Sequence, residues 1–370
     1  MKGNKGEWSE PYVALHLLAY GKLLMADTNG DKKTNDWMKI VSLLRNEAKD
    51  RTVKYVYQGN QIVIKVNGNT VKTIDKDEFA ENVEILKQDI VKGKGASFEV
   101  SDKVTEFFKR IELYAMKAKS INKSDIFVTV TDPRTSLTRE DIGFSIKSKF
   151  GKDPTLFNTA PASGVVYKIT GMNDVLMQKI NSMLDKKGHT AVMDRCNALK
   201  NEGCTLEFIG FPIASKAKCE AFRENLELIN PHLPNVIERI LWNHFFEGES
   251  KTDIKDVIQR IINENPLNIS RPEIKYPYMM KSFLYASYCG LTASTLWDGK
   301  SDVNGGYITV DEQGDVLANY ALESDSFKEY LYNMCYLEFP STGPGHGDYA
   351  KVYKKGEIYY FNLNFQIRIS

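Results

Sequence analysis

An aspartate and a lysine in the middle of the chain have the types and the spacing that metal-assisted chemistry on a phosphate ester requires. Asp125 opens an apolar run, and Lys147 stands two residues after Ser145 in a second run. A carboxylate binds a hard cation such as Mg²⁺, which lowers the pKa of its water and neutralises charge on a phosphate. An ammonium group beside the attacking water stabilises the charge that develops there. These side chains could therefore support hydrolysis of a phosphodiester.

Alternation with a period of two predicts the strands that would hold these side chains. The run 126–130 reads IFVTV and the run 142–147 reads IGFSIK. Between them, an Asp-Pro pair and a polar stretch are typical of a turn. We therefore expect a β-hairpin that brings Asp125, Ser145 and Lys147 close together, with the serine and the lysine on one face.

This arrangement resembles the core of the PD-(D/E)xK nucleases, in which an aspartate on one strand and an acid-x-lysine triplet on the next hold one or two divalent metals. Here Ser124-Asp125 is followed, after 19 residues, by Ser145-Ile146-Lys147. Ser124 stands where proline is usual, which is a common and harmless change. Ser145 stands where an acid is usual, which removes a metal ligand and leaves open whether two metals bind tightly.

On the residues alone, a simpler interpretation and a competing aspartate must be considered. A lysine on the exposed face of a strand and an aspartate at the start of a strand are both common without any function. Asp141 also competes with Asp125 for the metal-binding role, because it shares the strand of Lys147. At roughly 3.3 Å per residue, however, Asp141 would lie about 20 Å from Lys147. Asp125 is therefore the preferred aspartate.

Composition and the remaining motifs exclude several other classes of protein. The chain has 370 residues, 42% hydrophobic and 26% charged, as in an ordinary globular protein of one or two domains. It contains no apolar run long enough for a membrane span, and no signal peptide is expected. The five cysteines form no CxxC pair, which is typical of free thiols in a reducing cytoplasm. No histidine pair has metal-ligand spacing, and neither a GxxxxGK[ST] loop nor a GxSxG elbow occurs.

Positive charge gathers in two segments, although the formal net charge of the chain is only +1. From 117 to 152 there are eight Lys or Arg against four Asp or Glu, and from 351 to 368 there are four against one. Such segments favour a nucleic-acid backbone, although each could also be an ordinary solvated face. The side chains that we expect to contact DNA are Lys149, His346, Lys351 and Arg368. Further candidates as readers of guanine are Arg271 and Lys275, with Arg368.

The periodicities of the whole chain predict a mixed α/β fold in three segments. A nuclease core over 1–170 would hold the N-terminal helix and the catalytic hairpin. A mostly helical region would follow over 171–300, where apolar residues recur every three or four positions. A β-rich segment over 301–370 could contact DNA. Its glycine-rich loop around His346 either approaches nucleic acid closely or is an irregular turn.

Within the first segment the element boundaries can be predicted. The first helix should begin at Trp8 or Ser9, with Ser9 as its N-cap. Short alternating runs split by Gly-Asn and Asn-Gly pairs predict β-hairpins over 52–74. Helices are expected over 77–92 and 102–119.

Three stretches carry a narrower resemblance. The opening KGNKGEWSEPYV, the central DIGFSIKSKFGKDPTLFNTAPAS and the closing GHGDYAKVYKKGEIYYFNLNFQIRI are similar, in this order, to the HpaII-type restriction endonucleases. The resemblance covers essentially the whole chain. The GFSIKS stretch and the TLFN after it are general among restriction enzymes, whereas the GNKGEWSE opening is the more specific signature.

The resemblance implies a type II restriction endonuclease with a PD-(D/E)xK-like core and a requirement for Mg²⁺. It implies double-stranded CCGG as the target, with cleavage after the first C and protection by methylation of the inner cytosine. A cognate methyltransferase would be a functional but not a physical partner. A bacterial cytoplasmic protein, monomeric or homodimeric and independent of membranes, is expected.

Carried over to this chain, the resemblance makes Lys147 the residue that positions water and stabilises charge, with Ser145 in the acid position. The implied metal ligands are Asp125, the carbonyl of Ile146, and Glu10 or Glu7 of the first helix. An alternative explanation of these two acids is that negative side chains at the start of a helix interact favourably with the helix dipole. Two other functions stay open: a sequence-specific DNA-binding protein that has lost cleavage, as Ser145 would allow, and a repair nuclease.

Overall fold

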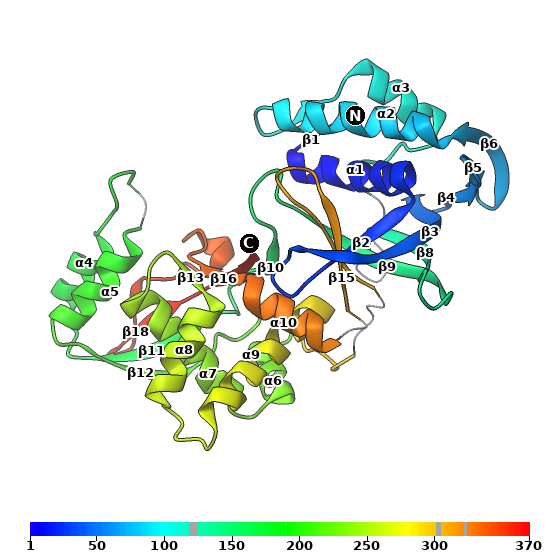
Figure 1. The fold of residues 1–370 in the computed structure, drawn as a ribbon. Helices are drawn as coiled ribbons and strands as arrows, with labels where there is room; N and C mark the ends of the chain where they lie inside the picture. Colours follow the sequence, from blue (N-terminus) through cyan, green and yellow to red (C-terminus); the bar gives the residue numbers. More distant parts are fainter. Residues whose placement is uncertain (118–123, 189, 301–304, 322–323) are drawn as a thin grey trace. The chain divides into compact units, whose positions relative to one another are not determined.

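The computed structural model describes residues 1–117, 124–188, 190–300, 305–321 and 324–370 of the chain (Figure 1). It confirms the expected mixture of helices and sheets. The chain divides into two compact units: unit 1 is Met1–Pro154 with Asp302–Tyr330, and unit 2 is Thr155–Ser301 with Leu331–Ser370. The three consecutive segments 1–170, 171–300 and 301–370 do not coincide with these units, because the last segment contributes strands to both.

Unit 1 is built, within the described residues, on a nine-stranded sheet of order β2-β15-β14-β9-β8-β3-β4-β5-β6. β2 also pairs with β3, so that the sheet curls back on itself. Two pairings are parallel, β14 with β9 and β15 with β2. The strands are β2 (Lys22–Ala26), β3 (Lys32–Ala48), β4 (Arg51–Gln58), β5 (Gln61–Val66), β6 (Asn69–Asp75), β8 (Ile126–Thr131), β9 (Thr138–Ser148), β14 (Gly306–Val310) and β15 (Val316–Tyr320).

The core of unit 1 lies on one face of this sheet. The helix α1 (Lys5–Tyr20) lies between the sheet and α2 (Lys76–Lys92), and α3 (Asp102–Arg110) packs on α2 (Figure 1). Buried strand residues such as Phe144 and Ile308 face this core. Because side chains alternate along a strand, the positions next to Phe144 and Ile146 point to the opposite face of the sheet. The core thus fixes which residues of β9 remain available for chemistry.

The first helix begins earlier than expected. α1 starts at Lys5, and its N-cap is Asn4 rather than Ser9. The Asn4 side chain accepts from the Glu7 N–H at 2.9 Å, and the Glu7 carboxylate accepts from the Asn4 N–H at 3.0 Å. This capping box satisfies two otherwise unpaired helix N–H groups and therefore sets the start. Ser9 is instead a buried helix residue whose hydroxyl donates to the Lys5 carbonyl at 2.9 Å.

Other boundaries in unit 1 are largely as predicted. The hairpins expected over 52–74 correspond to β4, β5 and β6, and the helix expected over 77–92 corresponds to α2. The helix expected over 102–119 ends at Arg110, where the chain turns. Glu112 has a φ of 64°, in the left-handed region that ends a right-handed helix. The last positions, 118 and 119, lie outside the described residues.

Unit 2 combines helices with two four-stranded sheets within the described part of the chain. One sheet has the order β12-β11-β18-β17 and the other β10-β19-β16-β13. The strands are β10 (Thr155–Phe157), β11 (Val165–Thr170), β12 (Thr205–Gly210), β13 (Lys251–Asp253), β16 (Cys335–Glu338), β17 (Val352–Lys355), β18 (Ile358–Leu363) and β19 (Gln366–Ile369). The helices are α4 (Asp174–Asn181), α5 (Val192–Asn201), α6 (Ala221–Ile229), α7 (Leu233–Trp242), α8 (Ile254–Glu264) and α9 (Pro272–Cys289).

The helical region over 171–300 also contains β12 and β13, which were not expected. A further helix, α10 (Ser324–Met334), runs from unit 1 into unit 2. Two short strands, β1 (Lys2–Gly3) and β7 (Phe98–Glu99), form a separate pair. None of the five cysteines, all of which the structure describes, forms a disulfide. None of the helices over the described residues has the length and apolarity to cross a membrane.

Candidate active site

The predicted hairpin forms and brings Asp125 against its second strand. β8 and β9 pair in antiparallel fashion, with Ile126 opposite Phe144. Just before β8, Oδ2 of Asp125 accepts hydrogen bonds from the backbone N–H of Ile146 at 2.8 Å and from the Ser145 hydroxyl at 3.2 Å. The structure therefore brings together three of the residues that the sequence singles out.

Lys147 shares a face of β9 with Ser145, and β14 supplies its neighbour. In the parallel pairing of β9 and β14, Tyr307 lies opposite Ser145. The Nζ atom of Lys147 lies 5.0 Å from the centre of the Tyr307 ring, within the range of a cation–π contact. Phe327 packs edge-on against the same ring, with 5.6 Å between the ring centres. The aromatic pair thus supports the ammonium group on the face that also carries Ser145.

The residues around Asp125 offer oxygen donors of the kind that Mg²⁺ prefers. In a strand, the N–H and C=O of one residue face the same edge. The N–H of Ile146 donates to Asp125, so the Ile146 carbonyl also lies on the edge of β9 that faces Asp125. This part of β9 lies beyond the residues that pair with β8. Mg²⁺ is usually bound by one or two carboxylates together with waters and substrate phosphates. One carboxylate, one carbonyl and one hydroxyl therefore fit a magnesium ion that is shared with a phosphodiester.

A metal site closed by protein ligands alone is not found in the described residues. No group of three or more His, Cys, Asp or Glu side chains there could hold a metal ion. This agrees with Ser145 in the position where an acid is usual. A magnesium ion at Asp125 would thus depend on oxygen atoms from the substrate and from water.

Of the two helix acids, Glu7 already has a structural role. Besides its capping hydrogen bond from Asn4, its Oε1 lies 3.2 Å from Nζ of Lys117. The Asn4 hydrogen bond and then Lys117 lower the pKa of Glu7 from its ordinary value. Glu10 follows on α1, where it is half-buried and takes no part in the cap. Which of the two acids could serve as a helix-borne metal ligand stays a prediction.

Asp141 is directed to another part of the sheet. Its φ of 47° is left-handed, and β8 and β9 are irregularly paired near it. Its N–H donates to the hydroxyl of Thr129 at 3.3 Å, and its Oδ1 lies 3.7 Å from Nζ of Lys54 on β4. The carboxylate thus contacts β4, which supports Asp125 as the aspartate of the site.

Comparison with known proteins places the chain in one family. The family model of the HpaII restriction endonuclease matches residues 4–369. The type II restriction enzyme HpaII of Haemophilus parainfluenzae is 30% identical over 368 residues, covering 99% of this chain and 98% of that enzyme. The chain belongs to the HpaII restriction endonuclease family. It is accordingly a type II site-specific deoxyribonuclease. No solved structure matches this HpaII-family chain.

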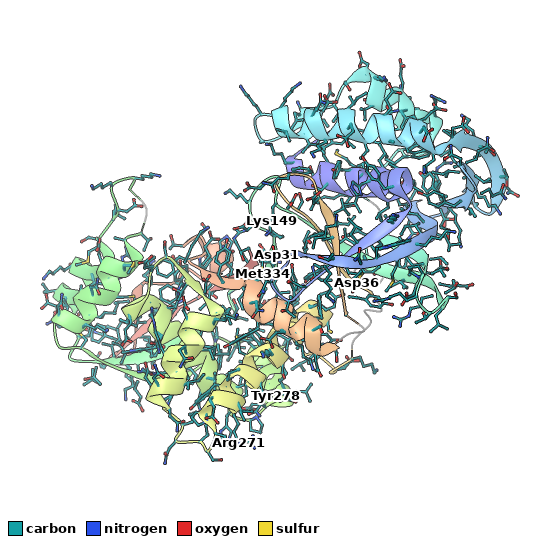
Figure 2. The ribbon with its side chains drawn as sticks, viewed as in Figure 1. Asp31, Asp36, Lys149, Arg271, Tyr278 and Met334 are labelled. Carbon is teal, nitrogen blue, oxygen red and sulfur yellow. The ribbon has the colours of Figure 1, made fainter. Side chains whose placement is uncertain are left out.

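The residues expected to contact DNA in this HpaII-family enzyme lie in both units. Lys149 follows β9 in unit 1, where its backbone N–H donates to the Val310 carbonyl at 2.8 Å (Figure 2). The others lie in unit 2. His346 ends a short 3₁₀ turn, and Lys351 forms an ion pair with Asp348 at 3.2 Å.

Arg368 has a structural partner. It lies on β19, and its guanidinium forms a close ion pair with Glu338 of β16. Arg271, labelled in Figure 2, stands at the start of α9 with a φ of 58°. Nζ of Lys275 donates to the Ser270 hydroxyl at 2.9 Å. A role in reading bases stays a prediction for each of these side chains.

Two residues of the site in this HpaII-family enzyme were not singled out from the sequence. Tyr307 reaches Lys147 only through the parallel pairing of β14, which joins positions far apart in the chain. Gly143 precedes the site on β9, where an added Cβ atom would lie 2.3 Å from the Ser124 hydroxyl. Any side chain at Gly143 would therefore push away the segment that carries Asp125. A glycine inside a strand-forming run was the one available signal.

Proposed function

We propose that this HpaII-family endonuclease cleaves double-stranded DNA at CCGG, after the first C, with Mg²⁺ bound at Asp125. The observation that carries phosphodiester cleavage is the contact of Asp125 with Ser145 and Ile146, with Lys147 on the same face of β9 as Ser145. The CCGG target is supported by membership of the HpaII family. An aspartate before one strand and a lysine on the next is the arrangement of a PD-(D/E)xK core. Phosphodiester hydrolysis is the chemistry that these groups support best.

In this proposal each side chain has a separate task. Lys147 orients the attacking water and stabilises the negative charge that develops on the phosphate. Asp125, the Ile146 carbonyl and Glu10 or Glu7 would hold the metal, while Ser145 fixes one oxygen of Asp125 by donating to it. When bound, Mg²⁺ lowers the pKa of a coordinated water and neutralises charge on the phosphate.

The biological setting follows from the same proposal. Methylation of the inner cytosine protects the host DNA, and a cognate methyltransferase installs it without binding the nuclease. The enzyme works in the bacterial cytoplasm, as a monomer or as a homodimer. The target is a two-fold symmetric sequence, so a homodimer could present one site to each strand.

One observation favours a second function, a DNA-binding protein that has lost cleavage. Ser145 removes a carboxylate from the position where an acid is usual, as a decayed nuclease would. Incubation of a plasmid with the protein and Mg²⁺ separates the two. Discrete fragments that end in CCGG sites are the expected result, whereas unchanged plasmid would support the binding protein. A smear would indicate a nuclease without sequence specificity.

A further inference from the structure

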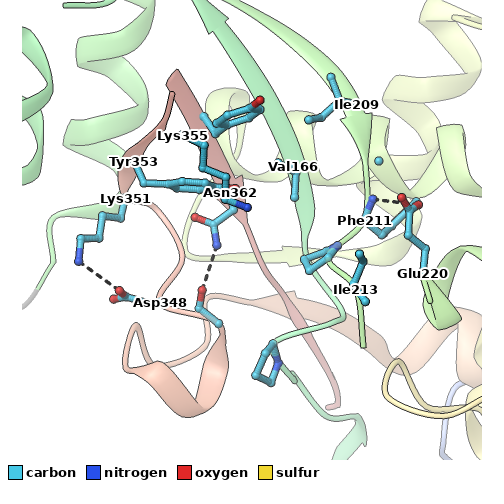
Figure 3. Close-up of a pocket in the computed structure, with 15 residues that line it drawn as sticks. Val166, Ile209, Phe211, Ile213, Glu220, Asp348, Lys351, Tyr353, Lys355 and Asn362 are labelled. Atoms are coloured by element: carbon cyan, nitrogen blue, oxygen red, sulfur yellow. Dashed lines mark hydrogen bonds and ion pairs between the residues drawn. The ribbon is translucent and has the colours of Figure 1, made fainter. Parts of the chain in front are cut away.

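A groove of about 700 Å³ lies over one face of the sheet β12-β11-β18-β17 (Figure 3). All of its lining residues belong to unit 2, so it is separate from the hairpin that carries Asp125. Its lining comes from strands β11, β12, β17 and β18 and from the loops before β11, after β12 and before β17. The groove is therefore an intact feature of unit 2 alone.

Two tyrosines form one wall of this groove. Tyr353 on β17 and Tyr360 on β18 are cross-strand partners. Their ring centres are 5.5 Å apart with an angle of 21° between the planes, so the rings stack. Nζ of Lys355 lies 5.6 Å from the centre of the Tyr353 ring. The stacked pair thus offers one outer aromatic face with a positive charge beside it.

Apolar side chains that remain in contact with solvent line the groove opposite the tyrosines. Ile209 is 45% exposed and Ile213 is 70% exposed. Val166, on β11, lies between these isoleucines and β18 (Figure 3). Leaving such side chains in water is unfavourable, and a planar apolar ligand would cover them. An aromatic face and an aliphatic face together fit an aromatic ring.

The polar groups of the groove specify the ligand further. The side-chain nitrogen of Asn362 donates to the Gly347 carbonyl at 3.0 Å, which fixes the orientation of the amide. Its Oδ1 is buried and has no hydrogen-bond partner in the structure. A buried acceptor without a partner is costly, so a ligand that brings an N–H donor would relieve it. Each nucleobase carries such a donor on its Watson–Crick edge.

The charges around the groove suit an anionic ligand. The carboxylate of Asp348 is paired with Lys351 at 3.2 Å, and that of Glu220 with Arg223 at 2.8 Å. Each of the two acids is thus neutralised by a cation. Within the described residues, the exposed Lys355 side chain interacts only with the Tyr353 ring. A phosphate group could approach Lys355 and Lys351 without meeting an uncompensated negative charge.

We propose that this groove binds one nucleotide of DNA that has left the base stack. The base stacks on the outer face of the Tyr353–Tyr360 pair, donates a hydrogen bond to Asn362, and its phosphate lies near Lys355. The inference rests on the proposed function in that DNA is the ligand, and it adds a second DNA-binding site to the enzyme. A duplex backbone fits less well, because an unbroken row of phosphates offers no ring that could stack on the tyrosines.

Binding of a fluorescently labelled single-stranded oligonucleotide, followed by anisotropy in EDTA so that no cleavage occurs, tests the proposal. Because stacking on an aromatic side chain contributes strongly to single-strand affinity, Tyr360→Ala should weaken binding roughly tenfold. Tyr360→Phe keeps the ring and should bind as the wild type does. The matched control is Tyr278→Ala, since Tyr278 lies on α9, is 65% exposed and is outside the groove (Figure 2).

A second variant guards against misfolding of Tyr360→Ala. Ile213 is largely exposed, so Ile213→Glu should leave the thermal unfolding midpoint unchanged while its charge at the groove weakens single-strand binding. Competition with deoxycytidine monophosphate should weaken the binding of the labelled strand. Variants that alter only the affinity for a blunt duplex would overturn the proposal in favour of a backbone contact.

Plasmid cleavage by the wild type separates this inference from the proposed function. If the wild type cuts CCGG and both Tyr360→Ala and Ile213→Glu bind single strands normally, only the nucleotide site is refuted. If single-strand binding depends on Tyr360 but the wild type never cuts the plasmid, only the assignment of cleavage is refuted. Absence of any single-strand binding by the wild type also overturns the nucleotide site.

Discussion

At the scale of single residues, Ser145 changes the electrostatics of the site. An acid at that position would place a second negative charge beside Asp125, and like charges need a cation between them. Ser145 instead donates a hydrogen bond to Asp125, as does the backbone of Ile146. The carboxylate is thus held in place by hydrogen bonds before any metal binds. If the proposed magnesium ion binds there, the site is preorganised and its single carboxylate predicts a modest metal affinity.

Removal of Asp125 or Lys147 is expected to abolish cleavage while DNA binding persists. Both groups stabilise charge mainly in the transition state, so Asp125→Ala and Lys147→Ala should each slow cleavage at least about 100-fold. The matched control is Asp141→Ala, since Asp141 contacts Lys54 rather than the site. Cleavage rates are measured on plasmid, and binding by gel shift in EDTA. Normal cutting by Asp125→Ala together with an inactive Asp141→Ala would show that the wrong aspartate was assigned.

Ser145 should also set the magnesium requirement. With one carboxylate fewer, the native enzyme is expected to need millimolar Mg²⁺, more than an enzyme with an acid-x-lysine triplet. Ser145→Asp should tighten metal binding and yet slow turnover, because the ion would be held in a different place. Cleavage rates over a Mg²⁺ titration measure both effects, with Ser145→Ala as the control for loss of the hydroxyl. Saturation of the native enzyme deep in the micromolar range would contradict this account.

At the scale of elements, local sequence patterns predicted individual strands and the turns between them. The alternation around Asp125 and Ser145 predicted β8 and β9, because strand periodicity and turn residues act within a few positions. The start of α1 was missed because two capping patterns overlap, and the Asn4–Glu7 box wins over Ser9. Tyr307 could not be predicted, since parallel pairing between distant strands leaves no local signal.

The capping box makes the stability of α1 depend on pH. The folded pKa of Glu7 lies below its unfolded value of 4.5. The ionised carboxylate therefore stabilises the fold above that value, and this contribution is lost as the pH falls through the lower folded pKa. We expect Glu7→Gln to be less stable than the wild type near neutral pH and to approach it at low pH.

Urea unfolding at a series of pH values measures this difference. The matched control is Glu106→Gln, because Glu106 is an exposed glutamate of α3. That variant should keep the pH dependence of the wild type. A difference between Glu7→Gln and the wild type that is constant from neutral to low pH would show that the carboxylate charge is not what stabilises the cap.

At the scale of the whole molecule, each unit is assembled from two stretches of chain. β14 and β15 return to the sheet that begins with β2, and β18 returns to pair with β11. Periodicity along the chain predicted a mixed α/β protein, but a contact between positions more than a hundred residues apart depends on tertiary packing. Units assembled from separate stretches of chain leave no local pattern that a prediction of consecutive segments could use.

Sequence specificity also belongs to the whole molecule, because several contacts must act together. Each strand of CCGG presents two guanines, whose N7 and O6 atoms face the major groove, and each bidentate Arg or Lys contact discriminates by about 1–3 kcal/mol. A methyl group at C5 of the inner cytosine enters the same groove and would displace such a contact, leaving buried polar groups unpaired. We therefore expect discrete cutting of unmethylated plasmid and strong protection of its CpG-methylated copy. Parallel digests with Mg²⁺ measure this, and equal cutting of both plasmids, or fragments that map to another tetranucleotide, would refute CCGG as the target.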